Sequence, residues 1–161
     1  MTFRFTSGFP GLQPLTETSS TQNHEIGLKA TGFDSVLGTG EYIYLKGVAS
    51  TVVGDLVVFD EYANTTTRAV SGSRGPVAVA MSANVANQYG WYQICGAAKV
   101  LALAAAAANA TAYLTATAGS IDDAVVTAQA VNGLRIKTNV DTPTTGMCVC
   151  QLAYPSADGL G

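Results

Sequence analysis

Few side chains in this chain of 161 residues have the chemistry of a catalytic or metal-binding group. The single histidine, His24, is followed by Glu25, but Leu28 stands four positions after it, so the zinc-binding His-Glu-x-x-His pattern is absent. A Ser-His-Asp or Cys-His arrangement would have to use His24, which lies in a segment without regular hydrophobic periodicity. We therefore expect a surface or interface histidine and no catalytic residues.

The three cysteines, Cys95, Cys148 and Cys150, are too few and odd in number for a disulfide framework, which is typical of a reducing compartment. Cys148 and Cys150 stand two apart in a predicted strand, which places both thiols on one face. A tetrahedral metal site would need two further ligands, and only Cys95 and His24 remain to supply them. We expect no bound metal ion.

Asp122 and Asp123 are adjacent carboxylates that would suit Ca²⁺ binding or an acid/base pair. Neighbouring residues of an extended chain point to opposite faces, so we predict a solvated turn instead. The glycines of segments 38–40 and 72–75 match neither the dinucleotide-binding pattern nor a P-loop. The sequence therefore predicts a protein that is not an enzyme and has no cofactor.

The charge of the chain argues against nucleic-acid and membrane partners. Eight Lys and Arg against eleven Asp and Glu give a net charge of −3, which provides no basic field for phosphates. The longest apolar run, residues 100–108, is far shorter than the roughly 18 residues of a membrane span. The first residues lack the basic and apolar regions of a secretory signal. We therefore expect the protein to fold in the cytoplasm of the cell that synthesises it. Only 12% of residues are charged, which lowers the electrostatic penalty against association.

The elements that must position any site are short β-rich runs separated by glycine and proline, from Glu41 onward. This pattern predicts an all-β domain over residues 39–161, built as a small barrel or sandwich. Residues 1–38 show no sustained period and are predicted to form an extended N-terminal arm. The predicted strands cover residues 41–46, 55–60, 77–82, 91–95, 112–115, 134–137 and 147–152.

Residues 97–118 are ambiguous between helix and strand. Alanine is the best helix former, so the run of alanines at 104–108 favours a helix. Against this, Leu101 and Leu103 alternate with Val100 and Ala102, as in a strand. We predict a strand over residues 97–103, followed by a short helical turn or loop.

The predicted arm carries isolated large apolar residues between its glycines and prolines. Such side chains either dock on a partner or pack back on the domain of the same chain. The candidate partner-interface residues are Phe3, Phe5, Phe9, Leu12 and Leu15.

Four segments follow one another along the predicted domain: GPVAVA at 75–80, GWYQICGAA at 90–98, AYLTATAGSIDD at 112–123 and MCVCQLAYP at 147–155. Their order resembles the capsid decoration (cement) proteins of tailed bacteriophages. The likeness covers residues 41–155 and is a pattern of strands and turns. It implies a β-barrel or β-tulip-like body, commonly trimeric, that lies on the outside of the phage head and clamps neighbouring major capsid protein subunits. Members of the family carry no catalytic residues.

The expected function is therefore a structural virion protein on the exterior of the capsid, with the major capsid protein as partner and a homotrimer as the assembly. A phage tail or head-completion component is the nearest alternative, since such proteins are also small and β-rich. Another alternative is a glycan-binding surface module, because aromatic rings offer stacking surfaces. The rings for that function would be Tyr42, Tyr44, Tyr62, Trp91 and Tyr92.

Overall fold

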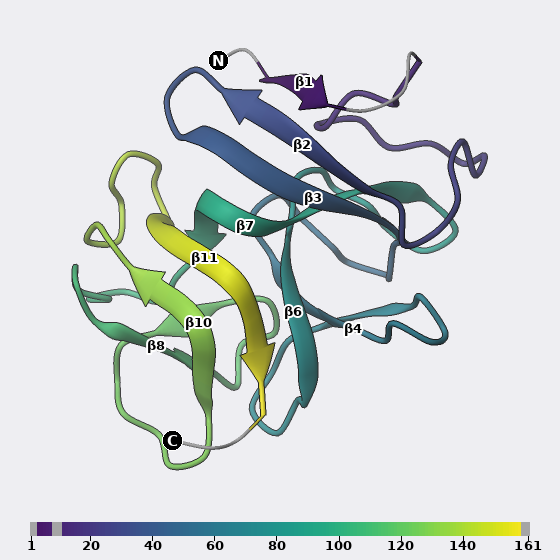
Figure 1. The fold of residues 1–161 in the computed structure, drawn as a ribbon. Coiled ribbons are helices and arrows are strands. Elements are labelled where there is room, and N and C mark those ends of the chain that lie inside the picture. Colours follow the sequence, from purple (N-terminus) through teal and green to yellow (C-terminus); the bar gives the residue numbers. More distant parts are fainter. Residues whose placement is uncertain (1–2, 8–10, 159–161) are drawn as a thin grey trace.

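The computed structural model describes residues 3–7 and 11–158, and these residues form strands, turns and loops without a helix. The predicted all-β class is confirmed. The strands form one eleven-stranded sheet with antiparallel pairing between strands (Figure 1). They are β1 (Phe3–Ser7), β2 (Lys29–Asp34), β3 (Gly38–Lys46), β4 (Leu56–Phe59), β5 (Thr66–Arg68), β6 (Gly75–Ala80), β7 (Tyr89–Leu101), β8 (Thr111–Leu114), β9 (Ile121–Asp122), β10 (Ala130–Ile136) and β11 (Met147–Ala157).

The long strand β7 connects the two halves of the sheet. The order of the strands is β1-β2-β3-β7-β6-β11-β10-β8-β9, with β4 beside β6 and β5 beside β4. The first part of β7 pairs with β3 and the second part pairs with β11. Figure 1 shows the consequence, with β1, β2 and β3 on one side of β7 and β8, β10 and β11 on the other.

The predicted strand over residues 97–103 is confirmed as far as Leu101, where β7 ends. The alanines that follow form turns rather than a helix. Ala105 has a φ of +75° and Asn109 a φ of +65°, in the left-handed region that a right-handed helix excludes. Intrinsic helix propensity is thus overridden by the path of the chain, which must turn from β7 towards β8.

Strands β6, β7 and β11 pair with one another, each pair antiparallel. Three straight strands cannot all be mutually antiparallel, so at least one of them must bend, and Figure 1 shows β7 and β11 curved. In β7 the bend is at Gly96, which has a φ of +98°. The Nε2 of Gln93 spans it, donating to the carbonyls of Cys95 and Ala97 at 3.0 and 2.9 Å. In β11 the bend is at Tyr154, which has a φ of +49°.

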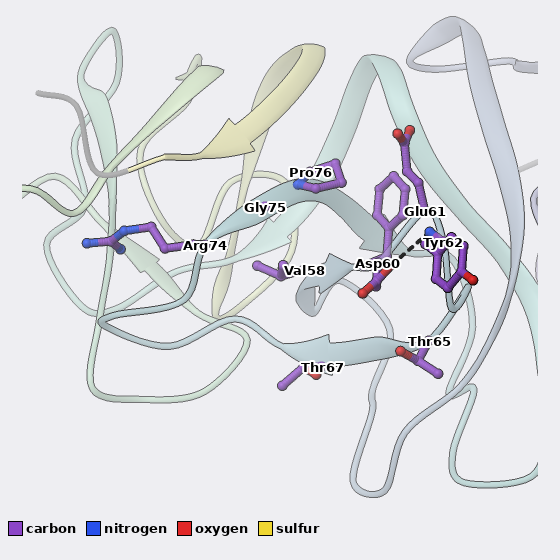
Figure 2. Close-up of a pocket in the computed structure, with 10 residues that line it drawn as sticks. Val58, Asp60, Glu61, Tyr62, Thr65, Thr67, Arg74, Gly75 and Pro76 are labelled. Atoms are coloured by element: carbon purple, nitrogen blue, oxygen red, sulfur yellow. Dashed lines mark hydrogen bonds between the residues drawn. The ribbon is translucent and has the colours of Figure 1, made fainter.

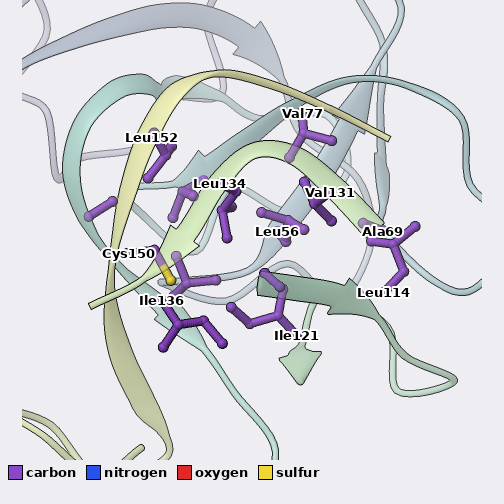
Figure 3. Packing of buried hydrophobic residues seen from close by; sticks show 14 of the residues in the cluster. Leu56, Ala69, Val77, Leu114, Ile121, Val131, Leu134, Ile136, Cys150 and Leu152 are labelled. Carbon is purple, nitrogen blue, oxygen red and sulfur yellow. The ribbon is translucent and has the colours of Figure 1, made fainter. Parts of the chain in front are cut away.

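The largest core cluster lies among β4, β6, β7, β8, β10 and β11 (Figure 3). Alternate residues of these strands supply it, including Leu134 and Ile136 of β10, while Arg135 between them is exposed. Cys148 and Cys150 also point into this cluster, with their Sγ atoms 3.5 Å apart. Ala78 and Ala80 of β6 face a second cluster of large apolar residues, so their small side chains lie beneath another layer of the same chain.

Part of the predicted arm belongs to the sheet. All six residues of β2 pair with β3, and Leu15 is 2% exposed in a cluster with Tyr44 and Trp91. The sequence pattern missed β2 because the residues on its buried face are Ala30, Gly32 and Asp34, which give no hydrophobic alternation. Strands β1, β5 and β9 were missed as well, since each is short or lies in a segment of low hydrophobicity.

An ion pair fastens the β4–β5 hairpin to the chain around residue 119. Asp55 is fully buried, and Arg68 donates from Nε to Oδ2 at 2.7 Å and from Nη2 to Oδ1 at 3.0 Å. Arg68 also donates from Nη2 to the carbonyl of Ala118 at 2.9 Å. Gly119 packs so closely on the Asp55 carboxylate that a Cβ there would collide with it.

Candidate partner interface

The residues with catalytic or metal-binding chemistry have structural roles. His24 is half-buried, and its Nε2 accepts a hydrogen bond from the backbone N–H of Gln13 at 2.9 Å. Its ring packs against Tyr44 and Trp91, with centroids 5.0 and 5.8 Å away. Gln13 fixes the same segment, because Trp91 donates from Nε1 to its carbonyl at 2.8 Å and Tyr44 donates to its Oε1 at 2.9 Å.

The two carboxylates of the 122–123 pair and the two core thiols also bind groups of their own chain. Asp123 accepts a hydrogen bond from the backbone N–H of Ala107 at 3.2 Å, and Asp122 accepts one from the backbone of Asp123. Contact with Cys148 and burial raise the pKa of Cys150, which keeps that thiol protonated. Within the part of the chain that the structure describes, no group of three His, Cys, Asp or Glu residues is placed to hold a metal ion.

The candidate residues of the predicted arm divide into two groups. Leu15 is buried in the chain's own core, and Leu12 is partly buried against the same cluster. Phe3 and Phe5 belong to β1, whose backbone pairs with β2, while Phe9 lies outside the described residues. Nothing in the structure describes the three phenylalanine side chains, so their role as partner contacts stays a prediction.

The aromatic residues expected to stack on glycans are mostly in the interior. Tyr42, Tyr44, Trp91 and Tyr92 are at most 1% exposed, so that part of the prediction is wrong. The physical reason is that β7 is covered on both faces: Trp91 packs into one core cluster and Tyr92 into another. Of the five rings, Tyr62 alone is exposed, at 98%.

Two adjoining grooves carry exposed tyrosines: Tyr62 lines one of them and Tyr154 lines the other. The larger groove, of about 510 Å³, lies between the β4–β5 turn and the start of β6 (Figure 2). The smaller one, of about 70 Å³, extends to β11 and shares three residues with the first. We call the combined area the exposed tyrosine surface. The residues that line it include Lys29, Phe59, Glu61, Tyr62, Arg74, Pro76, Ile94, Tyr154 and Pro155.

Local hydrogen bonds hold Tyr62 out from the β4–β5 turn. The Oδ1 of Asp60 accepts from the backbone N–H of Tyr62 at 2.7 Å and of Ala63 at 2.9 Å. These two bonds lower the pKa of Asp60, because they stabilise its charged form. Asn64 completes the turn with a φ of +54°. Figure 2 shows Tyr62 and Glu61 beside this turn, and Arg74 at the far end of the groove.

Tyr154 occupies the other end of the exposed tyrosine surface and was not singled out from the sequence. Its side chain is 58% exposed, and its hydroxyl donates to Glu41 Oε2 at 2.6 Å. This hydrogen bond is the main cause that raises the pKa of Tyr154 to about 12. A left-handed backbone at a non-glycine residue costs about 1–2 kcal/mol. The exposed ring of Tyr154 is thus carried by a locally strained backbone at the bend of β11.

The composition of this surface suits contact with a protein. Tyrosine is enriched among the residues that dominate binding energy at interfaces, because its ring buries a large area and its hydroxyl bonds at the rim. Pro76 and Pro155 add rigid apolar area, and Lys29, Glu61 and Arg74 supply both signs of charge.

Comparison of the chain with protein-family models, with curated proteins and with solved structures finds no match. The described residues also include no helix with the length and apolar character needed to cross a membrane. The function is therefore inferred from the fold and from the exposed tyrosine surface.

Proposed function

We propose that this protein is a capsid decoration protein, which binds the outer surface of a bacteriophage head and stabilises the contacts between major capsid subunits. The observation that carries the proposal is the exposed tyrosine surface, where Tyr62 of the β4–β5 turn is 98% exposed and Tyr154 of β11 is 58% exposed. The two tyrosines line connected grooves that share Phe59, Glu61 and Pro76, and a connected exposed apolar surface supports a contact with a partner. The resemblance of four sequence segments to decoration proteins supplies the identity of the partner.

The proposed body is a small β-tulip-like barrel. Supporting this, Ala102 at the end of β7 forms a parallel bridge with Ile121 of β9, and Leu103 donates to the carbonyl of Ile121 at 2.9 Å. Strands β7, β11, β10, β8 and β9 are thereby linked in a ring around the largest core cluster. Closure of a sheet removes free strand edges, which protects a protein present at high local concentration.

The proposed mechanism needs only contact area that is repeated many times. Three copies joined as a homotrimer would engage one lattice together, so each additional contact is intramolecular and avidity exceeds the affinity of one copy. The low charge of the chain favours such close association: only 12% of its residues are charged, so an interface has few charges to desolvate or pair. Bound copies stabilise the head because they must dissociate before neighbouring subunits separate.

The exposed tyrosine surface is tested by binding to heads that lack the protein. We expect Tyr62→Ser combined with Tyr154→Ser to weaken binding at least tenfold in sedimentation assays, which corresponds to about 1.4 kcal/mol. Val125→Ser is the matched control, because Val125 is 80% exposed but lies outside this surface. Binding of the double variant at wild-type affinity would assign the contact to another face. Association of the labelled protein with tails instead of heads would favour a tail component.

The arm phenylalanines are a second proposed contact with the capsid. Deleting residues 2–20 would also remove Gln13 and Leu15, which are bound in the body, so point changes are the sharper test. We expect simultaneous replacement of Phe3, Phe5 and Phe9 by serine to weaken head binding while sedimentation equilibrium still reports a trimer. Unchanged head binding would remove the arm from the interface.

A further inference from the structure

The segment that leads from β1 to β2 is fastened to the body of the protein at Gln13, which is 7% exposed. The Nε2 of Gln13 donates to the carbonyl of Tyr89 at 3.0 Å, and its Oε1 accepts from the hydroxyl of Tyr44 at 2.9 Å. Its backbone carbonyl accepts from Trp91 Nε1 at 2.8 Å. We call residues 11–24 the anchored segment, because these bonds join it to β3 and β7.

The backbone N–H of Gln13 relies on a titratable acceptor. It donates to His24 Nε2 at 2.9 Å. A backbone N–H can only donate, so Nε2 carries no proton and the neutral ring holds its proton on Nδ1. Histidine is the side chain that gains a proton near neutral pH, and both ring nitrogens are donors in the charged form. Protonation of His24 therefore removes the acceptor and leaves a second donor facing the N–H of Gln13.

The surroundings of His24 supply aromatic faces and exposed carboxylates. The ring centroids of Tyr44 and Trp91 lie 5.0 and 5.8 Å from that of His24. Glu17 lines a groove of about 520 Å³ together with His24, and Tyr89 stacks on Tyr44. Among the described residues, no ion pair joins His24 to a carboxylate. The titratable groups around the ring are therefore Glu17, Glu25, Tyr44 and Tyr89.

We propose that the hydrogen bond between His24 and Gln13 is an acid-sensitive latch, which holds the anchored segment on the body at neutral pH and loosens it when His24 is protonated. Aromatic rings attract cations, so Tyr44 and Trp91 retain the charged ring, and the group that loses its partner is the N–H of Gln13. A backbone N–H shielded from water and without an acceptor is destabilising. None of these residues lines the exposed tyrosine surface, so the latch is independent of the proposed capsid contact there.

The test follows the free full-length protein by NMR between about pH 7.5 and pH 5. The chemical shift of the Hε1 of His24, the single histidine, reports its protonation. Hydrogen exchange of the Gln13 backbone N–H and the Trp91 indole N–H, corrected for the intrinsic rate, reports opening of the anchored segment. We expect both protection factors to fall at least tenfold as His24 gains its proton. The backbone N–H of Ile136, in the largest core cluster, should keep its protection.

Two outcomes of this measurement would overturn the proposal. One is an imidazole that stays unprotonated down to pH 5. The other is protection factors of Gln13 and Trp91 that stay constant while the imidazole titrates, because the anchored segment would then not depend on the charge of His24.

Substitutions separate His24 from the neighbouring carboxylates. His24→Gln and His24→Ala both remove the titrating ring, so the protection of the Gln13 N–H should no longer change between pH 7.5 and pH 5. Combined Glu17→Gln and Glu25→Gln is the matched control, because it keeps His24 and should retain the tenfold loss in acid. A tenfold loss in either folded His24 variant, or its absence in the glutamate double variant, would assign the pH dependence to another group and overturn the latch.

Discussion

The buried carboxylate of Asp55 is balanced by Arg68, whose Nε lies 2.7 Å from Oδ2. Removing one partner of a buried ion pair costs roughly 3–5 kcal/mol, because the other charge stays buried and unpaired. The Arg68 side chain is 26% exposed and water screens it, so we expect Arg68→Ala to lower the free energy of unfolding by about 3 kcal/mol. Urea denaturation measures the change.

The exposed Arg74 provides the control for this substitution, since Arg74→Ala should change the free energy of unfolding by less than about 0.5 kcal/mol. Equal effects of the two alanine variants would contradict the structural role of the Asp55–Arg68 pair.

Two buried phenols make stability sensitive to alkaline pH. Burial, with the charge of Asp34 adding to it, raises the pKa of Tyr42 to about 12, and burial raises the pKa of Tyr92 to about 12. Above pH 10.0, the ordinary pKa, these phenols lose protons in the unfolded chain but keep them in the folded one. The free energy of unfolding should therefore be constant just below pH 10 and fall by about 1–3 kcal/mol per pH unit towards pH 12.

Urea denaturation at several pH values between 9 and 12 measures this decline. Tyr42→Phe removes one of the two phenols and should make the decline shallower. A free energy of unfolding that stays level from pH 10 to pH 12 would show that the two hydroxyls are not buried as described.

At the scale of elements, the bend of β7 depends on Gly96. Its φ is +98°, and a Cβ there would lie 2.6 Å from the carbonyl oxygen of Thr39. Gly96→Ala should therefore lower the free energy of unfolding by more than about 2 kcal/mol, from backbone strain and from this clash. Gly38→Ala is the matched control, because Gly38 has a φ of +86° but open space around its Cα. Thermal denaturation measures both variants. Equal decreases in the free energy of unfolding for Gly96→Ala and Gly38→Ala would show that the contact with β3 does not explain the need for glycine at the bend.

Strands with a regular pattern of apolar residues could be predicted from the sequence, and β4, β6 and β11 were. Strand β2 could not, because its buried positions hold alanine, glycine and aspartate and its stability comes from long-range pairing with β3. The exposure of the aromatic residues was equally hard to predict, because it also depends on long-range packing. Trp91 and Tyr92 are neighbours on a strand covered on both faces, whereas Tyr62 lies in a turn, and composition alone does not separate these environments.

At the scale of the whole molecule, the protein combines one large antiparallel sheet, a weakly charged chain and a surface with two exposed tyrosines. We propose that these properties serve a protein that acts by covering a lattice.

The most direct test of the central proposal counts the copies that bind to purified phage heads lacking the protein and records the temperature at which these heads rupture. The account predicts saturation at a copy number fixed by the lattice symmetry of the head, in multiples of three, and a higher rupture temperature for saturated heads. Heads that bind no protein, or that bind it without any change in rupture temperature, would contradict a decoration function.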